Sequence, residues 1–381
     1  MIAQGSVVKD QRGITARWLT STLRANGTIT DAKVRTLNVA PFQTKALSDL
    51  YLLQVTHSQE IDAPGSYILK VACKGQASPT ARRRRWKEHE FYATVAPVMI
   101  DPPVPKPYAS VYDAVAQRSH LLLADMTKTH WHPPAPLPPT PEQLRGAVDC
   151  LAEIHAHWWG HPDLHMVTSE RNAQWIEARA KGINDRLNRF LAEFDRHLPR
   201  SMVIALGAVA AAWPGILIRT AEMSLTVVHG DAHPWNFLTP NDGDAGRVCL
   251  LDWEGWSIEP GPHDLASLIA LHLPVSERRA IEDELLERYA TRLNDGGVVD
   301  YAAGSCRDDY RRAIARRVLS PVGLWSQGAH ARTWWPALEH ITQAYHNLRC
   351  EDVLESGHAN VEPAGSSTLA ILSPHMSNGL E

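Results

Sequence analysis

Three oxygen-bearing side chains in the middle of the chain could act together in one reaction: Asp231, Asn236 and Asp252. Apolar runs predict short strands around them, at 225–228, 237–238 and 248–251. The polar residues therefore fall in turns, where proteins display reactive groups. Carboxylate and amide oxygens are ligands that Mg²⁺ prefers. The pattern indicates phosphoryl transfer, with Asp231 orienting a hydroxyl group and accepting its proton, and with Asn236 and Asp252 binding Mg²⁺.

These residues belong to three linked motifs, which are His229-Gly230-Asp231-x4-Asn236, Leu251-Asp252-Trp253-Glu254 and Gly261-x-x-Asp264-Leu265-Ala266. In order and spacing they resemble the aminoglycoside phosphotransferase and choline kinase family. The resemblance implies ATP and Mg²⁺ as cofactors and transfer of the γ-phosphoryl group to a hydroxyl of a small organic molecule. It also implies that His229 and Asp264 support the catalytic loop and do not react.

The acceptor stays open among an aminoglycoside-type antibiotic or other natural-product alcohol, choline or another amino alcohol, a sugar and a sterol. In the family the acceptor lies against the helical lobe. Candidates for its pocket are therefore Trp253, Glu254, Trp256, Trp325 and His330, together with Trp334 and Trp335. A polycation such as an aminoglycoside would need carboxylates facing it.

An antiparallel sheet is predicted near the N-terminus, because segments rich in β-formers alternate with turns at 34–39, 50–55 and 67–71. Lys70 lies at the end of the third segment, where the resemblance implies the lysine that holds the α- and β-phosphates. A helix is predicted over 78–96. Its Glu88-x-x-Phe91-Tyr92 matches a family pattern, so Glu88 is expected to pair with Lys70.

The loop between the first two strands, 40–50, contains no glycine, although glycine lets backbone amides approach phosphate closely. At its end, Ser48-Asp49-Leu50-Tyr51 resembles the ecdysteroid kinase-like branch, and Ser48 is expected to contact the nucleotide. A buried strand is predicted at 120–124. The resemblance makes the turn after it the hinge that contacts adenine, with Leu123, Asp125 and Met126 as binding residues.

The expected fold is α+β: a protein-kinase-like fold of two lobes, the small one with an antiparallel sheet and the large one mainly helical. Residues 1–125 would form the nucleotide-binding lobe with the hinge at its end. Residues 126–354 would form the helical lobe that carries catalysis and the acceptor, and 355–381, rich in Ser, Gly, Pro and His, a mobile tail. A capping box at Thr140 and Gln143 predicts the first helix of the large lobe.

Composition excludes several classes of partner. Across 381 residues, 44% are hydrophobic and the net charge is -4, so no overall attraction to nucleic acid or to an anionic membrane is expected. The most apolar run, Val203 to Ile218, is shorter than a bilayer span and contains Pro214, which favours a core helix. Five widely spaced cysteines and the lack of a signal-peptide pattern favour the cytoplasm.

Two other hypotheses fit parts of the chain. His229, Asp231 and His233 alternate as in some metal-dependent hydrolases, although a zinc site would leave Asn236 and Asp252 without a role. The glycine-free loop is also compatible with a nucleotide-binding pseudokinase. The basic run Arg82 to Arg85 is expected to be a solvated helix face, and the alternative is that one arginine binds phosphate or an anionic substrate.

Overall fold

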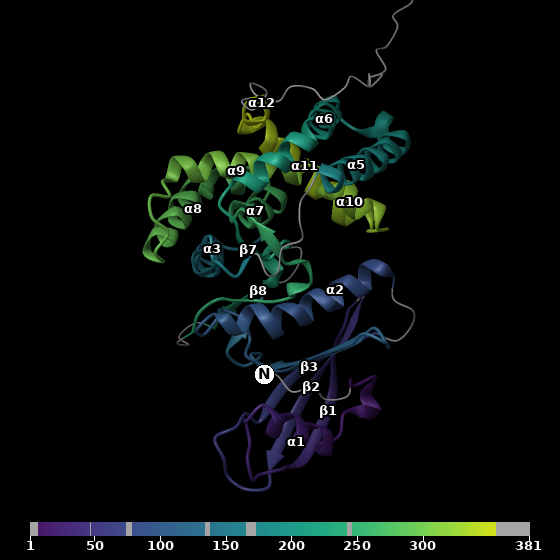
Figure 1. Cartoon of the computed structure of the whole chain (residues 1–381), viewed down its shortest axis with the longest axis vertical. Helices are drawn as coiled ribbons and strands as arrows, with labels where there is room; N and C mark the ends of the chain where they lie inside the picture. Colours follow the sequence, from purple (N-terminus) through teal and green to yellow (C-terminus); the bar gives the residue numbers. More distant parts are fainter. Residues whose placement is uncertain are drawn as a thin grey trace, which may run out of the picture.

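In a computed structural model the chain folds into two lobes (Figure 1). The structure describes residues 7–45, 47–73, 78–133, 138–164, 173–241 and 246–355. The N-terminal part, purple to blue, contains the long strands, and the later part, teal to yellow, is mainly helical. The expected α+β architecture is therefore confirmed. Apart from Glu355, the tail expected at 355–381 lies outside the described residues.

The small lobe is built on one antiparallel five-stranded sheet of order β1-β2-β3-β5-β4. Its strands are β1 (Val34–Thr44), β2 (Ser48–His57), β3 (Ser66–Ala72), β4 (Pro107–Asp113) and β5 (Arg118–Ala124). All the strands predicted for this part of the chain are confirmed. In β3, which lies between β2 and β5, Lys70 is opposite Leu50 on one side and Leu121 on the other. A central strand therefore fixes the position of this lysine.

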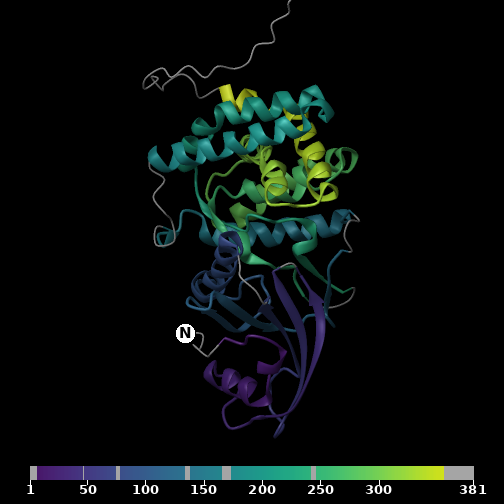
Figure 2. The same ribbon diagram turned by 90° about the vertical axis from the view of Figure 1, so that its right-hand side faces the viewer.

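Helices cover the two faces of this sheet (Figure 2). On the outer face lies α1 (Ala16–Ala25), capped by the Thr15 hydroxyl, which accepts a hydrogen bond from the Trp18 amide. Between the sheet and the large lobe lies α2 (Pro79–Glu90), which continues through η2 (Phe91–Val95) and η3 (Ala96–Val98). Phe91 and Tyr92 are buried in the core of the large lobe, so α2 connects the two lobes through shared packing.

The large lobe contains most of the helices. They are α3 (Pro141–Trp158), α5 (Ala173–Phe194), α6 (Arg200–Glu222), α7 (Pro262–Leu265), α8 (Val275–Asp295), α9 (Ala303–Arg317), α10 (Ser320–Ser326), α11 (Ala331–Asn347) and α12 (Asp352–Glu355). The predicted capping box begins α3, where the Gln143 amide donates to the Thr140 hydroxyl and the Thr140 amide donates to the Gln143 side chain. Helix α9 ends at Arg317, and Pro321 lies in the first turn of α10, where proline is tolerated.

The apolar run around Pro214 forms α6, a helix of 23 residues. By length and composition α6 is long and apolar enough to cross a membrane, so the shortness expected from the sequence is wrong. Within the described residues α6 packs against α5, α9, α11 and α12. Of its most apolar window 44% is buried inside the molecule, which agrees with the predicted core helix.

Short strands hold the turns that carry the chemistry-bearing residues. β7 (Thr226–Val228) pairs with β10 (Ser257–Glu259), and β8 (Phe237–Pro240) lies between β6 (His130–Trp131) and β9 (Cys249–Leu250). The predicted segments at 225–228, 237–238 and 248–251 are thus strands. The short turn η5 (Pro234–Asn236) precedes β8 and η6 (Trp253–Gly255) follows β9, while the π-helical η7 (Ala266–Leu271) continues from α7.

Candidate active site

Lys70 is the centre of a buried charged cluster at the junction of the lobes. Its Nζ lies 2.7 Å from Glu88 Oε1 on α2, 2.8 Å from Asp252 Oδ1 and 2.9 Å from Glu254 Oε1 on η6. The contact between Lys70 and Glu88 that the sequence predicted is present. Burial alone would lower the pKa of Lys70, but the three carboxylates outweigh it and raise the pKa well above its usual value.

Asp252 connects this cluster to the glycine-free loop. Lys45 directly follows β1, and its Nζ lies 2.6 Å from Asp252 Oδ2. Burial opposes ionisation of Asp252, but the ammonium groups of Lys70 and Lys45 outweigh burial and lower its pKa. Asp252 also has φ 62° and ψ 58°, a left-handed conformation that Asp tolerates better than most residues.

Three carboxylates of the cluster can offer oxygen ligands to a metal ion. Ligand atoms of Glu88, Asp252 and Glu254 lie within 4.8 Å of one another. Asn236 is buried in η5, and its Nδ2 donates to the Asp231 carbonyl 3.0 Å away, which leaves its Oδ1 able to accept. These hard oxygen donors fit Mg²⁺. Glu254, expected in the acceptor pocket, belongs to this cluster through Lys70.

The loop that carries Asp231 is held by its own backbone amides. Asp264, fully buried on α7, accepts from the His229 amide at 2.6 Å and from the Gly230 amide at 2.9 Å. His229 Nε2 donates to the Leu251 carbonyl at 2.7 Å, and its Nδ1 accepts from the Asp231 amide at 3.2 Å. The Asp231 side chain is itself exposed. The loop is rigid behind Asp231 and open in front of it.

Both nitrogens of the His229 ring are therefore occupied by protein groups, which leaves none for a metal. Among the described residues, the group placed to bind a metal is the carboxylate cluster around Lys70, and it includes none of His229, Asp231 or His233. The geometry gives no support to the metal-dependent hydrolase.

Gly230 fixes the turn before Asp231. Its φ is +81°, and a Cβ added there would collide with the Gly255 carbonyl oxygen. Arg317 of α9, which belongs to none of the sequence motifs, holds the same turn: its Nη2 donates to the Gly230 carbonyl at 2.7 Å. Behind the loop, the Tyr289 hydroxyl lies 2.8 Å from His155 Nδ1, and His155 Nε2 lies 3.4 Å from Asp264 Oδ2. His155 thus supports Asp264.

The expected nucleotide contacts on the sheet lie in its inner strands, with Ser48 opposite Ala72 and Leu123 opposite Ile68, near the two ends of β3. Ser48 is buried in β2 and, with Lys70 and Glu88, lines a small cavity. Leu123 is buried in β5. In the turn after β5, Asp125 Oδ2 accepts from the Ser66 hydroxyl at 2.6 Å, and the Met126 carbonyl accepts from the His130 amide at 2.8 Å. The Asp125 side chain and the Met126 carbonyl therefore already accept hydrogen bonds within the protein, and contact of these residues with adenine stays a prediction.

Of the tryptophans expected in an acceptor wall, Trp253 and Trp334 are buried in the core, which corrects that prediction for them, whereas Trp256 lines a cavity beside Gly230. Trp253 is fully buried and stacks on Phe91 with ring centroids 3.7 Å apart, because the η6 turn directs it into the core. Trp256 is 2% exposed and donates from Nε1 to the Lys87 carbonyl. Trp334 is buried as well.

Two other acceptor candidates lie at helix contacts. Trp325 packs edge-on against Phe190 and Phe194 of α5. His330 caps α11, where its Nδ1 accepts from the Arg332 amide. The half-buried Trp335 packs beside Trp334. Helix packing and capping, which periodicity alone does not reveal, account for these positions.

Comparisons with known proteins agree with the geometry. The sequence profile of the phosphotransferase enzyme family matches residues 39–303. No curated protein matches the chain. A candidate aminoglycoside phosphotransferase from Ralstonia eutropha has a TM-score of 0.51 at 15% identity, over 90% of this chain and 98% of that chain. A choline/ethanolamine kinase family protein from Mesorhizobium loti has a TM-score of 0.48 at 13% identity, over 90% and 99%. The chain belongs to the phosphotransferase enzyme family and has its two-lobed, protein-kinase-like fold.

Proposed function

We propose that this protein transfers the γ-phosphoryl group of ATP to a hydroxyl group of a small organic molecule. The observation that carries the proposal is the arrangement around Asp231. Its carboxylate is exposed at a cavity, while the loop beneath it is fixed by Asp264 and Arg317. Phosphoryl transfer depends mainly on positioning and on neutralising charge, and a rigid turn with an open carboxylate supplies the positioning.

Asp231 would bind the acceptor hydroxyl and hold it in line with the γ-phosphorus. The acceptor oxygen forms the new bond to phosphorus, the bond from phosphorus to the bridging oxygen of ADP breaks, and the hydroxyl proton passes to Asp231. General bases of this kind contribute about 10²- to 10⁴-fold. Gly230 and His229 contribute by holding the turn in the conformation that presents the carboxylate.

Lys70 would bind the nucleotide phosphates, and Glu88 would hold the Lys70 ammonium in place at 2.7 Å. Asp252 and Asn236 would bind Mg²⁺, which neutralises phosphate charge when it is bound. Lys45 is a second ammonium in the loop that lacks glycine, and it can contact phosphate with its side chain where backbone amides cannot approach as closely. This feature favours an active kinase over a pseudokinase.

The cellular setting of the proposed reaction is the cytoplasm. All five cysteines are free, and four of them are buried, which suits a reducing compartment. The small-molecule acceptor is the only partner that the proposal requires.

The experiment that tests this function measures ADP release with ATP and Mg²⁺ against aminoglycosides, amino alcohols, sugars, sterols and hydroxy acids. Phosphorus NMR identifies the phosphate monoester formed. We expect at least one acceptor to give ADP and monoester in equal amounts, with both lost in Asp231→Ala. A product formed equally well by Asp231→Ala would contradict the assigned base, and ATP that never binds would contradict the kinase.

A further inference from the structure

Two cavities adjoin the turn that carries Asp231. The larger, of about 420 Å³, includes Gly230, Glu254 and Gly255 in its lining. The second, of about 310 Å³, includes Asp231 itself. Arg179, His263 and Arg316 line both, so the two cavities meet along these side chains. A small acceptor with its hydroxyl at Asp231 would extend into this shared space.

The larger cavity is lined by an excess of positive charge. Its basic residues come from both lobes and are Arg83, Arg84, Lys87, Arg179 and Arg316. Its two carboxylates are already engaged: Glu254 lies 2.9 Å from Lys70 Nζ, and Glu259 forms two hydrogen bonds with the Arg316 guanidinium. Little negative charge is therefore left to face a positively charged acceptor.

The second cavity repeats this charge pattern. Among the described residues of its lining, the basic ones are Arg179, Arg186, Arg316 and Arg317, and the one carboxylate is that of Asp231. Arg317 is directed to the Gly230 carbonyl, and Arg316 to Glu259. Arg179 and Arg186 lie on the same face of α5, seven residues or about two turns apart. Among the described residues, Arg179 and Arg186 are the basic groups of this cavity for which no hydrogen bond of this kind is seen.

Three of these arginines have no salt-bridge partner in the described part of the chain. None of its carboxylates forms a salt bridge with Arg83, Arg179 or Arg186. Burial lowers the pKa of Arg179, and the positive charges of Arg316, Arg83 and Arg186 lower it further, while the charge of Glu259 opposes them. Like charges held together in this way are unfavourable until an anion joins them. The guanidinium group suits carboxylate and phosphate, which it can bind through two parallel hydrogen bonds.

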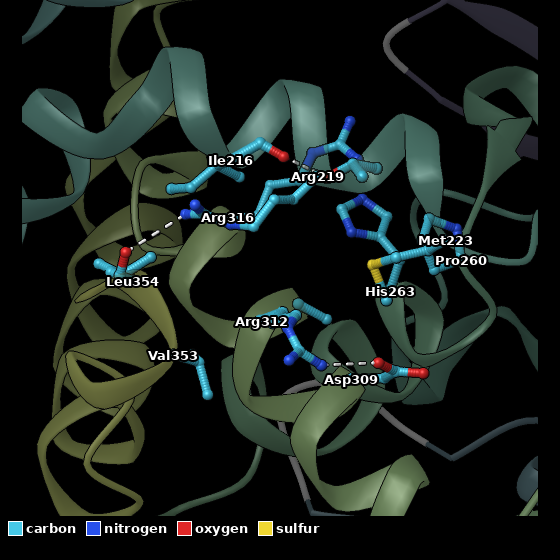
Figure 3. Close-up of a pocket in the computed structure, with 12 residues that line it drawn as sticks. Ile216, Arg219, Met223, Pro260, His263, Asp309, Arg312, Arg316, Val353 and Leu354 are labelled. Atoms are coloured by element: carbon cyan, nitrogen blue, oxygen red, sulfur yellow. Dashed lines mark hydrogen bonds and ion pairs between the residues drawn. The ribbon is translucent and has the colours of Figure 1, made fainter. Parts of the chain in front are cut away.

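A third cavity near Arg316 and His263 does not compete as an acceptor site. Figure 3 shows it between α6 and α9, with Arg312 directed toward Asp309, its partner at 3.0 Å. Its volume of about 20 Å³ is sufficient for a water molecule and little else.

We propose that the acceptor is an alcohol that carries an anionic group, a carboxylate or a phosphate, and that Arg179, with Arg83 and Arg186, binds this group while the hydroxyl lies at Asp231. The proposal rests on the function proposed above and narrows it. It opposes an aminoglycoside or a choline-like acceptor, because a cation would meet arginines in both cavities and, among the residues that the structure describes, no free cluster of carboxylates. Because Arg83 belongs to the small lobe and Arg179 to the large one, the anion would bridge the lobes.

Binding is measured first, so that the test does not depend on turnover. Calorimetry with Mg²⁺ and a non-hydrolysable ATP analogue compares matched probes: glycerol 3-phosphate with glycerol, hydroxy acids with their amides, and kanamycin and choline as cations. We expect only anionic members to bind, with an affinity that falls as salt rises. In Arg179→Gln this binding should weaken about ten- to hundredfold. The control Arg189→Gln, an exposed arginine of α5 outside both cavities, should bind like the wild type.

Three results would overturn the proposal: tighter binding of kanamycin or choline than of any anionic probe, anion binding that Arg179→Gln leaves intact, or no binding of any anionic probe at millimolar concentration. The turnover assay with Asp231→Ala is read separately. Phosphorylation of neutral or cationic alcohols would refute the anionic acceptor and leave the kinase standing. Anion binding at Arg179 without phosphorylation of any alcohol would refute the kinase and leave the anion site standing.

Discussion

The buried cluster around Lys70 and the arginine-lined cavities lie on opposite sides of Glu254, and they treat charge in opposite ways. In the cluster three carboxylates surround Lys70, and Lys45 adds a second ammonium at Asp252, so the charges are paired within the protein. In the cavities Arg83, Arg179 and Arg186 face solvent without a carboxylate partner in the described residues. The cluster is suited to a metal and phosphates, and the cavities are suited to an anion from outside.

This difference in charge pairing explains how two adjacent turns can serve two ligands, the nucleotide at Asp252 and the acceptor at Asp231. Gly230 and Gly255 are in close contact at the boundary between the regions, and the carboxylates on either side of them are held by different partners. Asp252 is bound by lysines, whereas Asp231 is exposed on a loop fixed from behind. Changes at Asp231 should therefore affect the acceptor, and changes at Asp252 should affect the nucleotide.

The largest effect on this comparison is expected from Asp231→Ala. Loss of the proposed base should lower kcat on the order of 10²- to 10⁴-fold, because the hydroxyl loses both its proton acceptor and its orientation. The melting temperature should change little, since the side chain is exposed. Steady-state kinetics with the best acceptor checks this, and a kcat within a few fold of the wild type would rule out Asp231 as the base.

The second test displaces the turn at Gly230, which lies between the cluster around Lys70 and the arginine-lined cavities. Gly230→Ala forces a Cβ into the Gly255 carbonyl at a residue with φ +81°, so the turn must shift. A displacement of about 1 Å at Asp231 can cost on the order of 10²-fold in kcat. Gly207→Ala is the matched control, because a Cβ there meets nothing within 4 Å inside α6 and should add about 0.5–1 kcal/mol of stability. Equal activity in both variants would show that the turn tolerates displacement.

A smaller effect is expected from a change at Lys45, in the loop that contains no glycine. Lys45→Met removes the ammonium 2.6 Å from Asp252, a partly exposed pair worth about 0.2–1 kcal/mol. We expect the KM for ATP to rise a few fold and the KM for the acceptor to stay unchanged. Lys33→Met, at an exposed lysine of the same lobe, serves as the comparison. A change in the KM for the acceptor alone would place Lys45 at the acceptor site and contradict this prediction.

An effect of another kind, on stability and not on catalysis, concerns the sheet that holds Lys70. Burial lowers the pKa of His120 to about 4, and its Nδ1 accepts from the Val8 amide. Because the unfolded chain binds the proton more readily, the contribution of neutral His120 to stability is full above about pH 6.5 and is lost as pH falls through 4, up to about 3 kcal/mol. Thermal unfolding between these pH values should show a flatter profile in His120→Gln than in the exposed control His132→Gln. Parallel profiles would contradict this.

Local pattern and resemblance predicted the fold, the family and the contact between Lys70 and Glu88. Alternating β-formers marked the strands around Lys70, and the three linked motifs indicated the family, while the roles of Asp231, Asn236 and Asp252 stay predictions. These features are encoded within short stretches of chain. The profile of the phosphotransferase enzyme family confirmed the resemblance, whereas the likeness to the ecdysteroid kinase-like branch stays a prediction.

The basic cavity could not be predicted in the same way. The run from Arg82 to Arg85 looked like a solvated face, yet Arg85 is buried against the Gln117 and Cys73 carbonyls, and Arg83 and Arg84 line the cavity. The positive charge of the cavity is evident only in the folded chain, where Arg179, nearly a hundred residues later in the sequence, lines the same cavity as Arg83. Long-range packing also directed Trp253 into the core.

The most direct test of this division is the dissociation constant of ATP in the presence of Mg²⁺, measured by calorimetry for the wild type, Asp231→Ala and Asp252→Asn. Asparagine keeps the size of the side chain and tolerates the φ of 62° at this position. We predict that Asp231→Ala binds within about twofold of the wild type and that Asp252→Asn loses at least about tenfold, or about 1.4 kcal/mol. Equal loss in both variants, or normal binding by Asp252→Asn, would contradict the separation of nucleotide and acceptor regions.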